Sequence, residues 1–294
     1  MDIYNEISTN KRNSFLLVSL FFAVIIILGF IFGYIFFDPY LGLFFAFFIS
    51  LIFTLISYYS GDKMILAMTG AKEARKPEHT YLINTVEGLA IAAGIPAPRI
   101  YVINEDSPNA FATGRNEKHA SVTVTTGLLR IMNREELEGV LAHEISHIKN
   151  YDVRFMMLVA TLVGITVLIS DMLLRSFFWS SGNRENRANT FIIVIGLIMA
   201  ILTPIIVQLI KLAVSRKREF LADASGALLT RYPPGLAGAL RKIKNDKEPA
   251  IAGVNRAVSH LFIADPMRFA GDKVKHWFST HPPLEERIRR LESM

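Results

Sequence analysis

The sequence has 294 residues, of which 51% are hydrophobic, with a formal net charge of +6 and no cysteine. The absence of cysteine excludes a disulfide-stapled secreted domain, a cysteine-ligated zinc or iron–sulfur site, and a thiol nucleophile. Two uncharged runs, Phe15–Phe37 and Tyr40–Tyr59, exclude an ordinary soluble globule, because about 18 or more consecutive apolar residues are typical of a membrane span.

Four apolar stretches are predicted to enter the membrane, and they are Phe15–Phe37, Tyr40–Tyr59, Phe155–Leu174 and Phe191–Val214. The first is longer than the apolar core of a cleaved signal peptide and no Ala-x-Ala site follows it, so we expect a retained anchor. The third contains Asp171, and the fourth contains Pro204, Gln208 and Lys211. Because polar residues inside a span usually face protein or water, a partly embedded hairpin is the alternative for this pair.

The short flanks of the first two spans predict the orientation of the chain. Lys11 and Arg12 precede the first span and Lys63 follows the second, whereas the Asp38-Pro39 turn between them carries no cation. Since cytoplasmic flanks are enriched in Lys and Arg, we expect both termini and both long polar segments to be cytoplasmic. Three arginines between Arg175 and Thr190, on the predicted outer side, count against this orientation without reversing it.

The positive charge is concentrated near the C-terminus. Residues 215–294 hold 15 Lys and Arg against 9 Asp and Glu, a difference equal to the whole net charge of +6. Nucleic-acid binding is one interpretation of this excess. Attraction to anionic lipid is the favoured one, because Lys211, Arg216, Lys217 and Arg218 lie at the end of a predicted span and directly after it. We therefore expect a lipid bilayer, and no nucleic acid, as a partner.

The polar segment 61–154 is long enough for a small domain with helices and strands. Helical spacing predicts a helix over Thr80–Ala93 that ends at Gly94. Short β-type runs predict strands over Arg99–Asn104 and Ala120–Thr126, the second broken by Gly127. Turn-forming residues occupy 106–109, between the two strands.

The best-marked helix follows these strands and is predicted from Arg134 to at least Lys149. Asn133 is an N-cap candidate, and Glu136, three residues later, completes a capping box. Apolar residues at helical spacing supply a buried stripe. No Pro or Gly lies between Lys149 and Phe155, so we expect this helix to continue into the third span.

Within this helix the sequence His143-Glu144-Ile145-Ser146-His147 forms an H-E-x-x-H motif. Residues i and i+4 share one face of a helix, so the two imidazoles are able to close on one metal ion. Zinc is the natural candidate, and Glu144 between them is placed to act as general base on water that the metal activates. The pattern is typical of metalloproteases, although it also arises by chance on a surface helix.

A zinc site of this kind needs a third ligand, and no further histidine follows the motif closely. An antiparallel hairpin formed by the third and fourth spans would return the chain to the same membrane face. Beyond it lie Glu219 and Asp223, which are i and i+4 on one helical face. We predict that Glu219 is the third ligand of a His₂Glu site and that Asp223 accepts the free ring N–H of a ligand histidine. A solvated carboxylate pair is the alternative.

These motifs, together with four predicted spans, resemble the HtpX family of bacterial membrane zinc endopeptidases, which is related to the CAAX prenyl proteases. The resemblance covers essentially the whole chain and includes residues 109–114 and 279–283. It implies one zinc ion per chain in a cytoplasm-facing, gluzincin-type site in the bacterial inner membrane. It also implies ATP-independent cleavage of damaged or misassembled membrane proteins during envelope stress.

The two additional segments each leave two interpretations open. The resemblance makes Asn109, Ala110 and Phe111 a substrate-pairing or cleft-lining element, whereas a turn Asn and a core Phe are the alternative. His281 precedes two prolines and a predicted helix that contains Glu285, Glu286, Arg287 and Leu291. His281 is either a catalytic residue that stabilises the oxyanion or a structural histidine.

The predicted fold is a mainly α membrane protein. It has either four transmembrane helices, or two transmembrane helices and a partly embedded hairpin. Two further segments form a cytoplasmic α+β zincin-like catalytic domain. Its divisions are a two-span anchor at 1–60, catalytic segments at 61–154 and 215–294, and a second hairpin at 155–214. The predicted function is zinc-dependent cleavage of misfolded membrane proteins or unfolded polypeptides. The alternatives are processing of lipid-modified C-termini and a non-enzymatic scaffold. The oligomeric state is not predicted.

Overall fold

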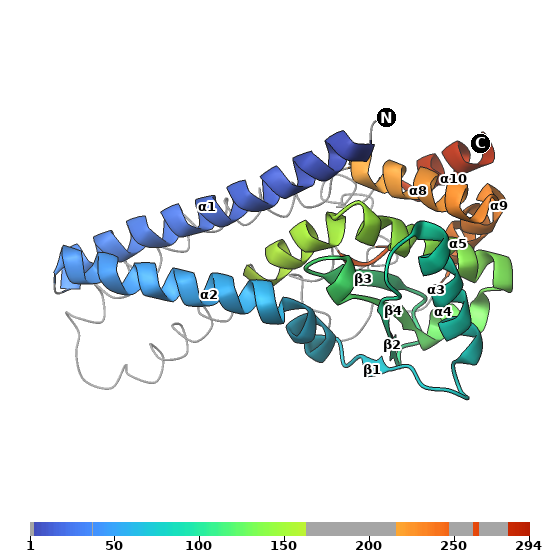
Figure 1. Cartoon of the computed structure of the whole chain (residues 1–294), viewed down its shortest axis with the longest axis horizontal. Helices are drawn as coiled ribbons and strands as arrows, with labels where there is room; N and C mark the ends of the chain where they lie inside the picture. The colour runs from blue at the N-terminus through green and yellow to red at the C-terminus, as the bar shows by residue number, and fades with distance from the viewer. Residues whose placement is uncertain (1–2, 37, 163–215, 247–260, 265–281) are drawn as a thin grey trace.

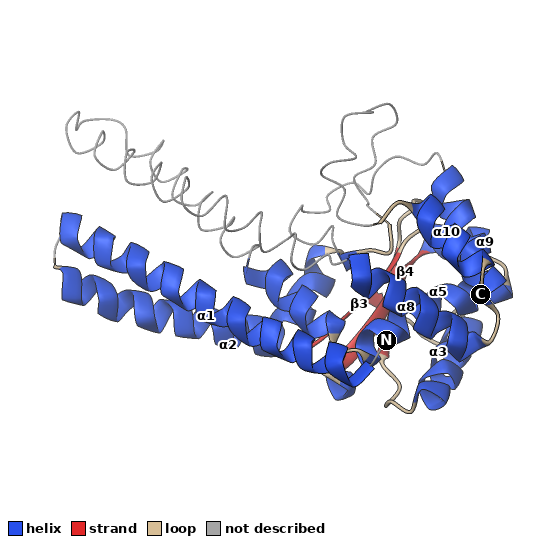
Figure 2. Ribbon diagram, turned by 90° about the horizontal axis from the view of Figure 1, so that it is seen from above, coloured by secondary structure: helices blue, strands red, loops and turns tan. Residues whose placement is uncertain are grey.

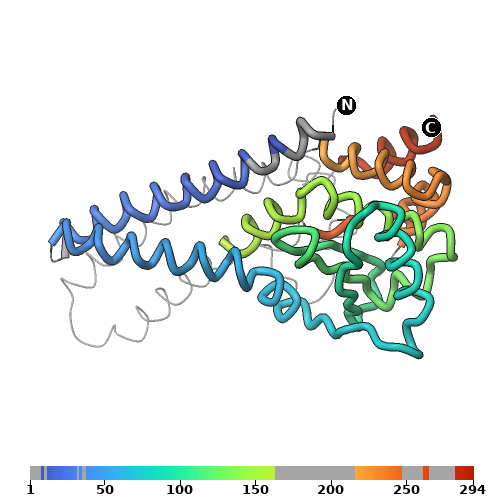
Figure 3. Tube along the Cα trace, viewed as in Figure 1, coloured from blue at the N-terminus to red at the C-terminus, as the bar shows by residue number. Residues whose placement is uncertain are grey.

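The computed structural model describes residues 3–36, 38–162, 216–246, 261–264 and 282–294. Its most prominent feature is a hairpin of two long helices, α1 (Ile3–Phe36) and α2 (Pro39–Met68), which extends away from the rest of the molecule (Figures 1 and 3). Within it, Arg12–Ile31 and Pro39–Met68 are long and apolar enough to cross a membrane. The first two predicted spans are therefore helices, and the fourth lies outside the described residues.

The hairpin is closed by an N-cap and by close helix packing. Asp38 Oδ1 accepts hydrogen bonds from the backbone N–H groups of Tyr40 and Leu41, each at 2.9 Å, and Pro39 occupies the first turn of α2. A side chain at Gly42 would overlap the backbone of Gly29. Small residues at this crossing thus allow the two backbones to approach, as is common between membrane helices.

The second part of the molecule contains a four-stranded sheet in the order β1-β2-β4-β3. Its strands are β1 (Lys72–Glu73), β2 (Arg99–Ile103), β3 (Ala110–Gly114) and β4 (Ala120–Thr125). β2 and β4 are parallel, and the other two pairs are antiparallel. The predicted strands at 99–104 and 120–126 are each confirmed to within one residue. β3 was not predicted, because Ala and Gly at alternate positions carry no strand signal.

Helices pack on one face of the sheet and around each other (Figure 2). They are α3 (Thr80–Ala93), α4 (Thr126–Ile131), α5 (Arg134–Lys149), α8 (Arg216–Thr230), α9 (Pro233–Asn245) and α10 (Leu284–Glu292). α3 has the predicted bounds and ends at Gly94 in a left-handed conformation with φ 71°. The helix predicted after His281 is α10.

α5 is the central helix of this part, and every residue from 139 to 148 is buried. Its predicted capping box is present: Asn133 Oδ1 accepts from the Glu136 N–H, and Glu136 Oε2 accepts from the Asn133 N–H, both at 2.8 Å. The cap fixes where the helix begins, and therefore which of its residues face inward.

The prediction that α5 continues unbroken into the third span is wrong. The helix ends at Lys149, Tyr151 has φ 61°, and a new helix runs over 152–162. A tyrosine in the left-handed region is not a local preference. The break is held by tertiary contacts, since Asp152 bonds back to His147 and helix 152–162 packs against α1 and α2. The remainder of the predicted third span lies outside the described residues.

Gly139 permits the close packing of α5 on α9. A Cβ atom there would lie 2.5 Å from the backbone nitrogen of Leu236 and 2.9 Å from its Cα. We expect Gly139→Ala to lower the free energy of unfolding by about 1–3 kcal/mol, as overpacking does, measured by denaturant titration in detergent micelles. Gly88 on α3 is the matched control, because a Cβ there meets nothing within 4 Å. Gly88→Ala is expected to leave stability unchanged or raise it by up to about 1 kcal/mol; equal effects at both positions would contradict the packing argument.

Candidate metal centre

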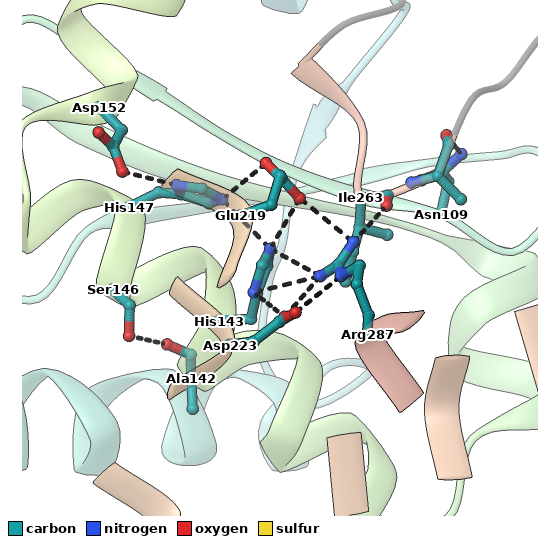
Figure 4. A network of polar contacts seen from close by, with 11 residues as sticks. Asn109, Ala142, His143, Ser146, His147, Asp152, Glu219, Asp223, Ile263 and Arg287 are labelled. Carbon is teal, nitrogen blue, oxygen red and sulfur yellow. Dashed lines mark hydrogen bonds and ion pairs between the residues drawn. The ribbon is translucent and has the colours of Figure 1, made fainter. Parts of the chain in front are cut away.

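α5 and α8 bring three potential metal ligands together in the interior. His143 and His147 lie one turn apart on α5, and Glu219 enters from the first turn of α8 (Figure 4). One ligand atom of each residue lies within 4.8 Å of the other two, and all three residues are buried. The structure thus brings together the ligands predicted from two distant segments.

The separations between these atoms suit a zinc ion. The His143 and His147 Nε2 atoms are 3.1 Å apart, His147 Nε2 is 3.5 Å from Glu219 Oε1, and His143 Nε2 is 3.9 Å from Glu219 Oε2. Tetrahedral ligands at about 2.0–2.1 Å from zinc are about 3.3–3.4 Å apart. Two imidazoles and one carboxylate therefore have both the chemistry and the spacing for this metal.

Each histidine has a buried carboxylate behind its other ring nitrogen. Asp223 Oδ1 is 3.0 Å from His143 Nδ1, as predicted, and Asp152 Oδ2 is 3.0 Å from His147 Nδ1. A carboxylate at Nδ1 orients the ring and leaves the Nε2 lone pair for a metal. Both Nε2 atoms point to the shared space with Glu219 (Figure 4).

Arg287 of α10 lies fully buried beside the two carboxylates of α8. Its Nε and Nη2 donate to Asp223 at 2.8 and 2.6 Å, its Nη1 is 3.2 Å from Glu219 Oε2, and its Nη1 also donates to the Ile263 carbonyl at 3.2 Å. The guanidinium thus offsets the repulsion between the carboxylates of Glu219 and Asp223.

The two histidines occupy different electrostatic environments. Burial lowers the pKa of His143 to about 4, against the opposing hydrogen bond with Asp223. Burial also disfavours a charged His147, but the hydrogen bond with Asp152 and the charge of Glu219 outweigh it and raise its pKa to about 9. For Asp223, the charge of Arg287 overcomes the effect of burial and lowers the pKa. The cluster is therefore built to hold positive charge next to His147.

Glu144 lies beside these groups with 2% of its surface exposed. Burial raises its pKa to about 7, while the charge of His147 and a backbone hydrogen bond from Ala112 act in the opposite direction. A carboxylate whose pKa lies near neutrality is suited to accept and return a proton.

Acidic groups outnumber buried guanidinium groups around the three ligand residues. The carboxyl groups belong to Asp152, Glu144, Glu219 and Asp223, and the guanidinium groups belong to Arg218 and Arg287. Because buried charges are costly unless they are paired, this excess of acidic groups favours the binding of a cation.

The remaining predicted site residues lie elsewhere or outside the described residues. The side chain of Asn109 is buried and donates from Nδ2 to the Ala264 carbonyl at 2.9 Å. Phe111 is fully buried, with its ring centroid 4.8 Å from that of Phe262. These placements match the alternative of a structural Asn and a core Phe. Ala110 lies on strand β3, and its carbonyl accepts from the N–H of Ile263 at 2.9 Å. His281 lies outside the described residues, so its role stays a prediction.

Sequence reasoning missed Asp152, Arg218 and Arg287. Asp152 follows His147 by five residues across the break at Tyr151, so no helical period links the two. Arg287 lies on an amphipathic helix with several other cations, and nothing local distinguishes it from Arg289 or Arg290. One feature of the sequence could have indicated that Arg287 is buried: it follows Leu284 by three residues and therefore shares the apolar face of the helix.

The fold and this arrangement together define a metallopeptidase of the membrane. Residues 76–294 match peptidase family M48, and the chain belongs to this family. The resemblance to the HtpX family is confirmed by the curated relatives. The Protease HtpX homolog of Dictyoglomus turgidum is 46% identical over 99% of this chain and 94% of its own length. That of Caldanaerobacter subterraneus subsp. tengcongensis is 44% identical over 99% of this chain and 98% of its own length.

A solved structure shares the fold at low sequence identity. The crystal structure of S. mikatae Ste24p is 21% identical, has a TM-score of 0.51, and aligns over 98% of this chain and 67% of that one. Together these comparisons establish a membrane metalloprotease of family M48 with an HtpX-like sequence.

Proposed function

We propose that this protein is a zinc-dependent endopeptidase of the bacterial inner membrane, with His143, His147 and Glu219 as the zinc ligands. The observation that carries the proposal is the convergence of these three donors beside the buried Glu144. When bound, zinc polarises a peptide carbonyl and lowers the pKa of water toward about 7. Asp223 and Asp152 orient the two histidines.

Glu144 is the proposed general base. It takes a proton from water as the water oxygen forms a bond to the scissile carbonyl carbon, and it returns that proton to the amine nitrogen as the C–N bond breaks. Its buried position keeps bulk water from competing for the proton. His281 is retained as a proposed catalytic residue that would stabilise the oxyanion.

An extended substrate is proposed to pair with strand β3 beyond Ala110, because β3 is the edge strand of the described sheet and the carbonyl of Ala110 already accepts from the N–H of Ile263 at 2.9 Å. The backbone N–H of Ala112 on this strand hydrogen-bonds Glu144, so the strand runs alongside the proposed base. Asn109, Ala110 and Phe111 would then support the substrate strand by shaping this edge. Misfolded membrane proteins expose extended segments of the kind that such an edge accepts, and we infer that they are the substrates.

The active site is proposed to face the cytoplasm, as the positive flanks of the first span predict. An impermeant thiol reagent tests this with a cysteine in place of Ser293, which is exposed next to the C-terminus of a chain that has no other cysteine.

The proposed function is tested by measuring metal content and cleavage together. The purified full-length protein in detergent micelles is expected to hold about one zinc per chain, to cleave casein and a destabilised membrane protein, and to lose cleavage on chelation and regain it with zinc. A lipid-modified peptide in the same assay tests the processing alternative. Cleavage that is unaffected by removal of the metal would contradict the proposal.

A further inference from the structure

Asp152 is a fully buried carboxylate at the first residue of helix 152–162. Its Oδ2 lies 3.0 Å from Nδ1 of His147, and its Oδ1 lies 4.0 Å from Nε of Arg218. A carboxylate at a helix N-terminus is also stabilised by the helix dipole. Asp152 is therefore held from three directions, and one of its partners is a proposed zinc ligand.

Arg218 fixes the start of the same helix. It precedes Glu219 on α8 and is buried, and its guanidinium carbon lies 4.6 Å from the centroid of the Phe155 ring. Such a contact is a cation–π interaction. Arg218 thus contacts two residues of helix 152–162, three positions apart, and places Asp152 toward His147.

Helix 152–162 packs directly against the α1–α2 hairpin. Phe155, Leu158, Val159 and Leu162 pack against Leu17 and Phe21 of α1 in one apolar cluster. On the α2 side, Ser57 hydrogen-bonds Thr161. A Cβ at Gly61 would lie 3.0 Å from Thr161 Cγ2 and 3.2 Å from Met157 Cγ, so these two helices are in close contact.

We propose that Asp152, held by Arg218, is a positioning residue for His147 and couples the metal centre to the packing of helix 152–162 on the α1–α2 hairpin. The inference rests on the proposed zinc site. It implies that a change on a membrane helix, remote from every metal ligand, alters zinc affinity through Asp152.

The first arm of the test measures zinc affinity of the full-length protein by competition with a chromophoric chelator. Asp152→Asn is expected to weaken zinc binding by about 10–100-fold, as the loss of a histidine's carboxylate partner does. The absorption bands of the cobalt(II)-substituted protein are expected to shift as well, because a neutral amide makes a weaker hydrogen bond to His147 than the carboxylate does. Asp62→Asn is the matched control, since Asp62 is a buried carboxylate on α2 paired with Arg99 at 2.8 Å.

The control is expected to keep wild-type zinc affinity to within about twofold, because Asp62 does not contact the ligands and asparagine has nearly its volume, so the packing of α2 on helix 152–162 is unchanged. Wild-type affinity in Asp152→Asn, or an equal loss in Asp62→Asn, would overturn the positioning role. A wild-type protein that binds no zinc would instead reject the proposed function itself, so the two failures are distinguishable.

The second arm tests coupling with Gly61→Val, and Gly61→Ala if the larger side chain prevents folding. Gly61→Val is expected to weaken zinc binding by about 2–30-fold, the range of coupling through packed contacts. Gly88→Val, at an open position, is expected to have no effect. In the Asp152→Asn background, Gly61→Val should add less than about a twofold loss, because its route to the metal is already broken. Fully additive losses, or no loss in Gly61→Val, would overturn the coupling.

Discussion

Glu144→Gln is expected to reduce peptide cleavage by at least about 10²–10⁴-fold, the usual contribution of a general base, while zinc stays bound at the wild-type level. The amide has nearly the shape of the carboxylate, but it does not accept a proton from water. Because Glu144 is not among the three converging ligand atoms, its replacement leaves them in place. The measurement is the initial rate of cleavage together with the zinc content of the same sample.

Glu136→Gln is the matched control for this variant. Glu136 lies on the same helix, is also buried, and pairs with Lys242 at 2.6 Å, away from the metal centre. Glutamine preserves the capping box, so the control changes a buried charge without removing the cap. Cleavage by Glu144→Gln at the rate of this control would contradict the assignment of the general base.

Glu219→Ala is expected to leave the purified protein without stoichiometric zinc and therefore inactive. Only two imidazoles would remain, and the smallest set of protein ligands in catalytic zinc sites is three. Removing the carboxylate also leaves Arg287 paired with Asp223 alone, so more of its positive charge acts on the metal site beside His143 and disfavours a second positive charge. Elemental analysis after gel filtration measures the loss.

Asp223→Ala provides the comparison, because Asp223 lies behind His143 and is not itself among the three ligands. It is expected to weaken zinc binding by about 10–100-fold without abolishing it. Thermal unfolding of the zinc-free proteins separates lost metal from lost fold, since both residues also pair with Arg287. A full equivalent of zinc in Glu219→Ala, or an equal loss in both variants, would contradict the ligand assignment.

Local sequence patterns were sufficient to predict the helix that carries the H-E-x-x-H motif and several neighbouring helices. The capping box at Asn133 placed the start of α5 at the correct residue, and the spacing of His143 and His147 follows from one helical turn. Gly94 marked the end of α3. The apolar runs marked α1 and α2, because the cost of exposing such surface to water depends little on the rest of the fold.

Contacts between distant segments decided the remainder. The break at Tyr151 carries no Gly or Pro signal and is stabilised by the bond from Asp152 to His147 and by packing on the hairpin. Strand β3 consists of residues with weak strand preference and exists because β4 pairs with it.

The apolar runs thus predicted a membrane-anchored protein. The absence of cysteine and the spacing of a few residues predicted a zinc site with nitrogen and oxygen ligands. The groups that hydrogen-bond or pair with those ligands are determined by the tertiary structure. Arg287 is separated from Glu219 by 68 positions and Asp152 is separated from His147 by a helix break, so only packing brings them together. Buried charges are tolerable only in specific three-dimensional pairings, and such pairings leave no periodic trace in a sequence.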